Sequence, residues 1–380
     1  MTHGLEERDW ELLLRRIKDG KCTPFIGPEV SAQVMPLRQH VAQSWAHQYD
    51  YPLADTHDLA RVAQYMAVQY DPIYPKEEMQ KQVTAVTPLD FTNSDQPHSV
   101  LAQLDLPVYI TTNYDDLMEQ ALQHHKKDPK QELCRWNALL QRSQPSILDT
   151  GYDPTPANPL VYHLHGHYQT PESLVLTEDD YLDFLVNISS EAFKLPHRIQ
   201  RAMTGASLLF IGYNPIDWDF RVLFRGLVAA TEAGLRRISV TVQLPPVPEG
   251  TPAATQTKVQ RYLDGYFSHT DTQMRAYWGT TQQFITDLWQ RWQGAETGKP
   301  RGDAKGSVPL IDPLQLLSNL QDAFDKEEMM MVAFELQVDY ESLPERKDGF
   351  ARELIVYLQR RKRLHELLEV VRRERPSHEW

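Results

Sequence analysis

The pattern that most constrains this chain is a strand, a tight turn and a helix within residues 106–122, LPVYITTNYDDLMEQAL. The run VYIT at residues 108–111 has the β-branched and aromatic composition of a buried strand. It stops at Thr112 and Asn113, and apolar residues at helical spacing begin soon after Asp115. They are Leu117, Met118, Ala121 and Leu122. Parallel α/β sheets are built from units of this kind.

The turn of this unit carries polar side chains where parallel sheets bind ligands. In open α/β sheets the ligand lies in the crevice outside the carboxyl ends of the strands. Asn113 and Asp115 follow the strand directly, so we expect both to meet a ligand. Each also has an ordinary structural explanation: a strand-end asparagine often forms the turn, and Asp115 or Asp116 is suited to cap the helix.

A second buried strand is predicted within residues 159–168, PLVYHLHGHY, with its end at Gly166. Side chains alternate along a strand, so His163, His165 and His167 are expected to share one face. Three imidazoles on one face suit a metal ion, as in zinc hydrolases with an HxH motif, if a carboxylate ligand and an open position complete the site. Taken alone, His165 is more often a packed histidine than a catalyst.

Further strands and helices alternate along the chain. Strands are predicted at residues 22–26, 207–212 and 238–244, and helices at 5–18, 36–49, 57–69, 177–186, 218–230 and 280–292. This alternation predicts an α/β fold with a doubly wound, Rossmann-like parallel sheet and helical insertions. We assign residues 1–292 to this domain.

Composition excludes several classes of protein. The 380-residue chain has a formal charge of −13, which argues against general nucleic-acid binding because that needs a basic surface. Its two cysteines, Cys22 and Cys134, cannot form a disulfide framework or a four-cysteine zinc site. The sequence has neither an apolar leader segment nor a run of transmembrane length. A cytoplasmic protein that does not bind membranes is expected.

The Asn-x-Asp turn and the LHG strand end together resemble the sirtuin-type NAD-consuming domain. The forms TTNYDDLMEQAL and HLHGH are most similar to bacterial sirtuin-like defence proteins, and less similar to the protein deacetylases, whose zinc cysteines are missing here. Residues 51–79 also resemble this family and are expected to form a helical insertion at the pocket rim. The resemblance covers residues 20–292.

The phosphate-binding loop departs from the pattern of this family. The sirtuin-type fingerprint is G-A-G-x-S, whose backbone N–H groups hold the pyrophosphate. Gly27 and Ser31 match its first glycine and its serine, but Pro28 replaces the alanine and Glu29 the second glycine. A carboxylate there adds bulk and repels an anion. Either Glu29 points outward, or the loop binds another nucleotide, or it binds no phosphate.

The resemblance implies hydrolysis of NAD⁺ to nicotinamide and ADP-ribose, with NAD consumed as substrate and without a metal or a redox step. His165 would be the general base, Asn113 would hold water or the ribose in line, and Asp115 would contact the nicotinamide side. The implied substrate-binding residues are Gly27, Ser31, Thr112, Gly166, Gly212, Tyr213 and Asn214. Two alternatives stay open: a nucleotide-binding sensor without catalysis, and the HxHxH metal-dependent hydrolase. A protein deacylase is disfavoured.

The C-terminal part of the sequence predicts a small all-α bundle. Residues 293–309 are rich in Gly, Lys and Pro and are expected to be a linker, whereas residues 310–380 carry apolar stripes at helical spacing. This segment resembles the effector-associated, death-like adaptor domains of bacterial conflict systems. The resemblance implies a partner protein with a like domain, and a homo-oligomer. Charged helices that simply solvate the bundle are the ordinary explanation of its many charges.

Overall fold

The chain divides into two compact units, Met1–Glu296 and Thr297–Trp380. The computed structural model describes residues 5–93, 95–188, 195–205, 207–213, 239–244, 258–259, 261–262, 273–297, 320, 323–336, 338, 347–360, 367, 370–371 and 375. The predicted helix at 218–230 lies outside these residues, as does the predicted site residue Asn214.

The first unit is built on one seven-stranded parallel sheet, in the order β3-β4-β2-β1-β5-β6-β7. Its strands are β1 (Cys22–Ile26), β2 (Val108–Thr111), β3 (Lys130–Leu133), β4 (Leu160–His163), β5 (Ser207–Ile211), β6 (Ser239–Leu244) and β7 (Gln273–Trp278). From β1 the chain passes to β2, continues to the edge strand β3, comes back to β4 between β3 and β2, and then places β5 on the other side of β1. Ligands of doubly wound folds bind at this reversal.

Helices cover both faces of the sheet, because alternate strand residues feed two separate apolar clusters. In β1, Phe25 joins one cluster and Ile26 the other. The cluster around Phe25 includes residues of α7 (Ala138–Ser143), α8 (Glu178–Ile188) and α9 (His197–Thr204). The cluster around Ile26 includes residues of α1 (Glu7–Lys18), α5 (Pro97–Gln103), α6 (Leu117–His124) and α12 (Thr281–Thr297). The predicted doubly wound α/β fold is confirmed.

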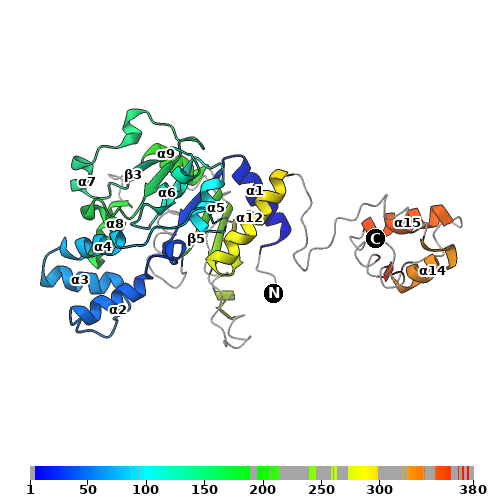
Figure 1. Cartoon of the computed structure of the whole chain (residues 1–380), viewed down its shortest axis with the longest axis horizontal. Coiled ribbons are helices and arrows are strands. Elements are labelled where there is room, and N and C mark those ends of the chain that lie inside the picture. Colours follow the sequence, from blue (N-terminus) through cyan, green and yellow to red (C-terminus); the bar gives the residue numbers. More distant parts are fainter. Residues whose placement is uncertain are drawn as a thin grey trace. The chain divides into compact units, whose positions relative to one another are not determined.

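Three helices between β1 and α5 form a helical insertion (Figure 1), of which the second lies within the predicted residues 51–79, the third begins there and the first precedes them. They are α2 (Arg38–Gln48), α3 (Leu59–Gln69) and α4 (Tyr74–Thr84). They share an apolar cluster of their own, which includes Trp45, Val62, Met66 and Met79. The Asp58 side chain caps α3 by accepting hydrogen bonds from the backbone N–H groups of Ala60 and Arg61.

Some elements differ from the sequence prediction. β3, β7, α5, α7 and α9 were not predicted; β3, for example, is a four-residue edge strand whose sequence KQEL lacks an apolar run. The helix α12 continues to Thr297, so the segment predicted as a linker from residue 293 begins inside a helix. The sequence QGAET at its end contains no proline to stop the helix there. Residues 298–309 are not described.

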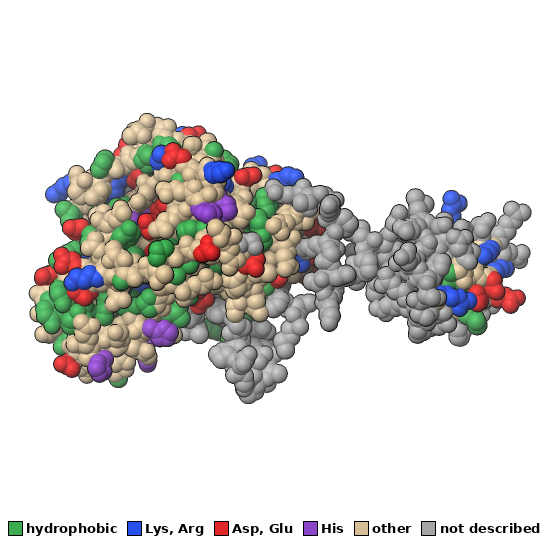
Figure 2. Space-filling model, in the orientation of Figure 1, with side chains coloured by type: hydrophobic (Ala, Val, Ile, Leu, Met, Phe, Trp, Pro, Cys, Tyr) green, Lys and Arg blue, Asp and Glu red, His purple; other side chains and the backbone are tan. Residues whose placement is uncertain are grey.

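The described part of the second unit is helical and has its own apolar cluster. It contains α14 (Lys326–Glu335) and α15 (Lys347–Arg360), and its buried side chains include Phe324, Leu336 and Leu354. Of all helices in the described ranges, none is long and apolar enough to cross a membrane. On the face of the first unit that Figure 2 shows, acidic and basic side chains are interspersed.

Candidate active site at the carboxyl ends of β1 and β2

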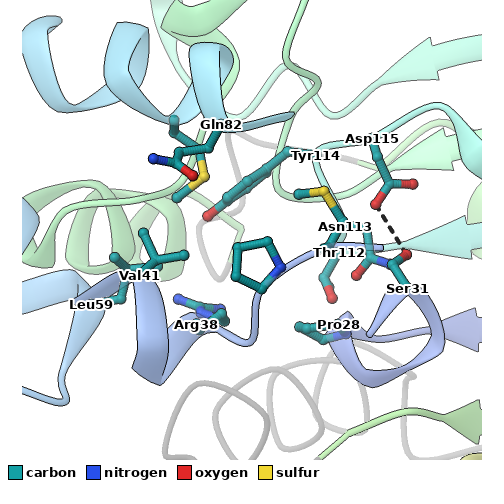
Figure 3. A pocket seen from close by; sticks show the side chains of 13 residues that line it. Pro28, Ser31, Arg38, Val41, Leu59, Gln82, Thr112, Asn113, Tyr114 and Asp115 are labelled. Atoms are coloured by element: carbon teal, nitrogen blue, oxygen red, sulfur yellow. Dashed lines mark hydrogen bonds between the residues drawn. The ribbon is translucent and has the colours of Figure 1, made fainter. Parts of the chain in front are cut away.

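Three predicted site residues meet in one buried hydrogen-bonded cluster. Ser31 ends the 3₁₀ turn η1 (Pro28–Ser31), which follows β1, while Asn113 and Asp115 come from the turn after β2. The Ser31 hydroxyl donates to Asp115 Oδ2 at 3.1 Å and accepts from Asn113 Nδ2 at 3.0 Å (Figure 3). The adjacent β1 and β2 are paired in parallel, so their two turns lie at the same edge of the sheet.

His98 extends this cluster and was not predicted. Gln96 Oε1 accepts the backbone N–H of Ser99 at 2.7 Å, which turns the Gln96 amide nitrogen towards His98 Nδ1 at 2.9 Å. His98 Nδ1 is therefore the acceptor, and Nε2 carries the hydrogen that faces Ser31 Oγ at 3.5 Å. Burial lowers the pKa of His98 to about 3, so the ring is neutral. No motif marks this residue, because its role depends on α5 packing beside η1.

The backbone of Asn113 is held on both sides, which aims its side chain into the site. Its N–H donates to Thr111 Oγ1 at 3.0 Å, and its carbonyl oxygen lies 3.4 Å from His163 Nδ1. Asn113 is only 6% exposed, and its Oδ1 has no hydrogen-bond partner within the part of the chain that the structure describes. A buried acceptor of this kind favours a ligand that brings a donor.

Asp115 is a buried carboxyl group that titrates close to neutrality. Burial raises its pKa to about 6, although its hydrogen bonds from the Leu117 backbone N–H and the Ser31 hydroxyl act in the opposite direction. The bond from Leu117 is 3.1 Å long and caps the start of α6. Asp115 therefore carries the predicted capping contact, and Asp116 makes no such bond.

A pocket opens beside this cluster (Figure 3), with a volume of about 520 Å³ when the open solvent at its mouth is included. One side is the end of the sheet, with Pro28, Ser31 and residues 112–115. The other side is the helical insertion, which contributes Arg38, Val41, Leu59, Met79 and Gln82. Polar groups converge at the sheet end, and the insertion faces them with apolar side chains and with the polar Arg38 and Gln82.

The loop predicted to hold phosphates uses its backbone donors internally. The N–H groups of Gly27, Glu29 and Val30 donate to the carbonyl oxygens of Ile211 at 2.8 Å, Gly212 at 3.1 Å and Gly27 at 3.2 Å. The loop packs tightly on the end of β5, because a Cβ on Gly27 would lie 2.5 Å from the Gly212 oxygen. The Glu29 carboxylate accepts from Thr281 Oγ1 at 3.5 Å, and burial raises its pKa.

The remaining predicted residues at this edge support the pocket. Thr112 lines it and donates from Oγ1 to the Tyr213 hydroxyl at 3.2 Å. The Tyr213 hydroxyl in turn donates to the Ile26 carbonyl oxygen at 3.2 Å, so Tyr213 joins the ends of β1 and β2. The Gly212 N–H donates to Gln243 Oε1 at 2.9 Å.

The three histidines do not share one face, so this prediction is wrong. The strand β4 ends at His163, and the chain then turns at Gly166, where φ is +88° and a Cβ would lie 2.2 Å from the Ser173 oxygen. His163 bonds to Glu119 of α6, whereas His165 packs edge-on against Tyr181 and Phe184 of α8, on the opposite side of the sheet.

This arrangement also removes the geometric basis of the metal-hydrolase alternative. The ring of His167 lies next to that of His163, with ring centroids 4.7 Å apart, whereas His165 lies on the other face of the sheet. Among the residues that the structure places, no group of three or more His, Cys, Asp or Glu side chains is arranged to hold a metal ion.

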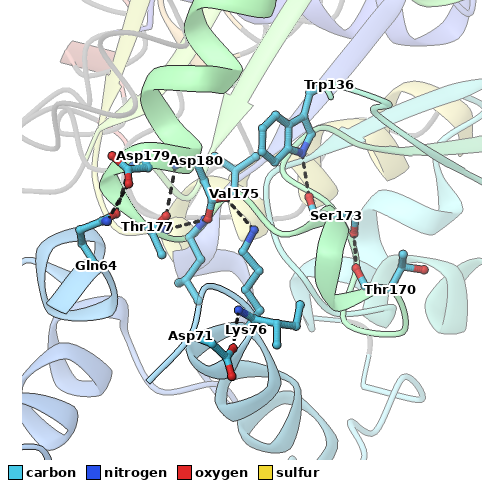
Figure 4. Close-up of polar contacts among 12 residues, drawn as sticks. Gln64, Asp71, Lys76, Trp136, Thr170, Ser173, Val175, Thr177, Asp179 and Asp180 are labelled. Atoms are coloured by element: carbon cyan, nitrogen blue, oxygen red, sulfur yellow. Dashed lines mark hydrogen bonds and ion pairs between the residues drawn. The ribbon is translucent and has the colours of Figure 1, made fainter. Parts of the chain in front are cut away.

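The first turn of α8 connects His165 to the pocket wall. The Tyr181 hydroxyl accepts from Arg38 Nη2 at 2.6 Å, and Arg38 lines the pocket. The three preceding residues of α8 also contact the insertion. Glu178 pairs with Arg61 at 3.1 Å. Asp179 contacts Gln64 at 2.7 Å and Asp180 contacts Lys76 at 2.7 Å (Figure 4). Four consecutive residues thus fix the insertion that closes the pocket.

Comparisons with known proteins identify two domains in this chain. Residues 107–268 match the SIR2-like domain, and residues 314–376 match effector-associated domain 7. The NAD(+) hydrolase ThsA of Cytobacillus dafuensis is 29% identical over 130 residues, which are 34% of this chain and 23% of that protein. The NAD(+) hydrolase ThsA of Enterococcus faecium is 33% identical over 120 residues, 32% of this chain and 22% of that protein.

The NAD(+) hydrolase ThsA of Bacillus cereus (strain MSX-D12) is 24% identical over 140 residues, 37% of this chain and 26% of that protein. The matched part thus spans about a quarter of the length of these relatives. The predicted combination of a sirtuin-like domain with a C-terminal effector-associated domain is confirmed.

Proposed function

We propose that this chain hydrolyses NAD⁺ to nicotinamide and ADP-ribose. The observation that carries the proposal is the Ser31–Asn113–Asp115 cluster, which lines a pocket at the end of a SIR2-like sheet and contains the buried Asn113 Oδ1, an acceptor without a partner among the described residues. The names of the relatives, NAD(+) hydrolases, support the same activity.

The proposed reaction needs two contributions from the protein: the positioning of the water and the ribose, and one proton transfer. The nicotinamide of NAD⁺ leaves ribose C1′ with the electron pair of the broken C–N bond, and positive charge develops on the sugar. A water oxygen then bonds to C1′ and loses a proton. We assign Asn113 Oδ1 to hold the water or a ribose hydroxyl in line, which is a positioning role.

Asp115 and His165 complete the proposed machinery. A carboxylate at Asp115 stabilises the positive charge that develops beside it, since opposite charges attract strongly in a buried site. His165 is the proposed general base, because an imidazole is suited to proton transfer near neutral pH. Its position beyond β4 corresponds to that of Asn113 beyond β2, because His163 and Thr111 are paired in the sheet.

We further propose that the enzyme is an effector in bacterial defence against phage, and that its second unit recruits or activates it. The match of residues 314–376 to effector-associated domain 7 supports an interaction role for this unit. The proposed partner is a protein with a like domain, and the proposed state of the chain is a homo-oligomer.

A second candidate function is a sensor that binds a nucleotide without cleaving it. It is favoured by the η1 loop, in which the N–H groups of Gly27, Glu29 and Val30 already donate to backbone carbonyls. These donors would otherwise be the ones to hold a pyrophosphate.

One experiment separates the two functions. The full chain is incubated with NAD⁺, nicotinamide and ADP-ribose are quantified by chromatography, and NAD⁺ binding is measured by calorimetry. Hydrolysis predicts both products in equal amounts, and their loss in Asn113→Ala but not in Gln123→Ala, a control on the exposed side of α6. Binding of NAD⁺ without nicotinamide release favours the sensor. Equal turnover by Asn113→Ala contradicts the assignment of the site.

A further inference from the structure

We propose that Glu119 and His163 form a buried positioning dyad that fixes the carbonyl group of Asn113 and so aims its side chain at the reacting centre. The dyad lies behind the turn that carries the catalytic cluster, and neither residue lines the pocket. This inference rests on the proposed hydrolysis, because it gives the two residues a role in the same site.

The contacts of His163 define the dyad. Its Nε2 lies 2.5 Å from Glu119 Oε1, and its Nδ1 lies 3.4 Å from the Asn113 carbonyl oxygen. The His163 side chain is 0% exposed and that of Glu119 is 9% exposed. A carboxylate and a carbonyl both accept hydrogen bonds, so the imidazole that bridges them donates from both nitrogens and is positively charged.

Electrostatics agree with this protonation state. Burial by itself lowers the pKa of His163, but the charge and the hydrogen bond of Glu119 outweigh it and raise the pKa above its ordinary value. The neighbouring His167 stays neutral, because burial lowers its pKa to about 3. The dyad therefore holds one positive and one negative charge, the arrangement in which buried ion pairs are tolerated.

The dyad fixes the turn that follows β2, because one of its residues belongs to β4 of the sheet and the other belongs to α6. His163 is the last residue of β4, is paired with Thr111 of β2, and accepts the Cys134 backbone N–H at 2.9 Å. Glu119 lies in the first turn of α6, which starts immediately after the turn. With its N–H held by Thr111 Oγ1 and its carbonyl by His163, the Asn113 backbone cannot rotate without breaking a buried bond.

The position of Asn113 Oδ1 depends on this lock. Asn113 lines the pocket, and because its Nδ2 donates to Ser31 Oγ, its Oδ1 is left buried and without a hydrogen-bond partner among the described residues. A turn that rotates would move Oδ1 relative to the bound ribose, and a displacement of about 1 Å can lower a rate by about 100-fold. The contacts with the rest of the nucleotide would largely remain, so the displacement should lower kcat more than it lowers the affinity for NAD⁺.

The main test replaces both residues by apolar ones, Glu119→Leu with His163→Phe. Exchanging a buried ion pair for packed apolar side chains is often neutral for stability, whereas removing one partner leaves an unpaired buried charge. We expect the double variant to fold with a cooperative transition, to lose about 10- to 100-fold in kcat, and to bind ADP-ribose within about threefold of the wild type. The control is Gln123→Leu, which is exposed on α6. A folded double variant with wild-type kcat overturns the proposal.

A second measurement does not depend on turnover or on that variant folding. In the full-length wild type with ¹⁵N-labelled histidine at pH 7.5, both ring nitrogens of His163 should be protonated, and Glu119→Gln should return the ring to a neutral tautomer. The His163→Gln variant assigns the signal. A neutral His163 in the wild type overturns the dyad. A charged His163 in a protein that binds NAD⁺ without cleaving it refutes the proposed hydrolysis but leaves the dyad as a support of the binding site.

Discussion

At the scale of single residues, Asp115 gives the site a pH-dependent stability. Its folded pKa of about 6 lies above the ordinary value of 3.8. Between these values the folded state holds a proton that the unfolded state has lost, so this contribution to stability is full below about 4 and is lost as pH rises through about 6.

Asp115→Asn removes this dependence, because an amide does not ionise. The stability of the variant relative to wild type should rise by about 2.5 kcal/mol from pH 4 to pH 7.5, since each pKa unit corresponds to about 1.4 kcal/mol and a small part of the effect has already developed at pH 4. Urea denaturation of both proteins at the two pH values measures the change, and Asp116→Asn serves as the neighbouring control. A relative stability that is constant with pH would mean that Asp115 is not held out of water.

His165 needs a variant that separates chemistry from packing. Its ring centroid lies 5.6 Å from that of Tyr181 and 5.2 Å from that of Phe184, so His165→Ala leaves a cavity as well as removing a base. His165→Phe keeps the aromatic contacts and removes the proton acceptor. We expect a loss of at least about 100-fold in kcat with a melting temperature close to wild type. Turnover retained by a folded His165→Phe protein would exclude His165 as the base.

At the scale of elements, the sequence predicts helices and strands best where the spacing of apolar residues agrees with the burial of the element in the core. The VYIT strand and the α6 helix are predicted correctly because both are fully patterned and lie in the core. The prediction that the three histidines share one face fails, because the chain turns after β4 where Gly166 packs against Ser173, and sequence spacing does not contain this contact. His98 was missed for the same kind of reason, since α5 brings it to Ser31 from a distant part of the chain.

The expected effect of Glu29 also depends on tertiary structure. Its sequence position beside Gly27 predicts a carboxylate next to the pyrophosphate, but the side chain points to Thr281 at the start of α12. Which way a side chain turns from a loop is set by the elements packed around it, and these are far apart in the sequence.

The contact between α4 and α8 should control how firmly the insertion closes the pocket. Lys76 and Asp180 form a nearly buried ion pair, with side chains 9% and 12% exposed, and Lys76 also lies 5.8 Å from the centre of the Trp136 ring. Lys76→Met leaves the Asp180 charge buried without its partner, which should cost about 3 kcal/mol and weaken NAD⁺ binding.

Lys81 provides a matched control on the same helix. Lys81→Met breaks an ion pair of similar length with Glu78, but this lysine is 69% exposed, so little change is expected. Thermal denaturation and calorimetric titration with NAD⁺ compare the two variants with wild type. If Lys76→Met and Lys81→Met behaved alike, the α4–α8 contact would have no special role in closing the pocket.

At the scale of the whole molecule, the second unit has the features of a separately folding module. Its apolar cluster is formed by its own residues, among them Leu320, Val332 and Leu358. Arg375 bonds to Glu328 at 2.5 Å and lies 4.9 Å from the centre of the Phe324 ring, which ties the C-terminal segment to α14. Residues 297–380 should therefore unfold cooperatively as an isolated fragment, with helical circular dichroism before the transition.

The charges of this unit predict how it would pair with the proposed like-domain partner. Residues 310–345 contain nine acidic residues and one basic residue, whereas residues 346–380 contain ten basic and six acidic residues. A module that is acidic in one half and basic in the other is suited to bind a like domain head to tail. Exposed charges are screened over about 8 Å at physiological ionic strength, so pairing should weaken steeply as salt is added.

Reversing charge within the basic half is the direct test of this pairing. Arg360, Arg361 and Arg363 are changed together to Glu, and the variant is compared with wild type by circular dichroism and by co-purification with the like-domain partner at low and high salt. We expect a folded variant that no longer pairs, because its second half loses the basic excess that the acidic half attracts. The matched control changes the same residues to Lys, which keeps the charge. Pairing of the Glu variant that persists at both salt concentrations would exclude the charge-driven mode and leave an apolar interface as the basis of recruitment.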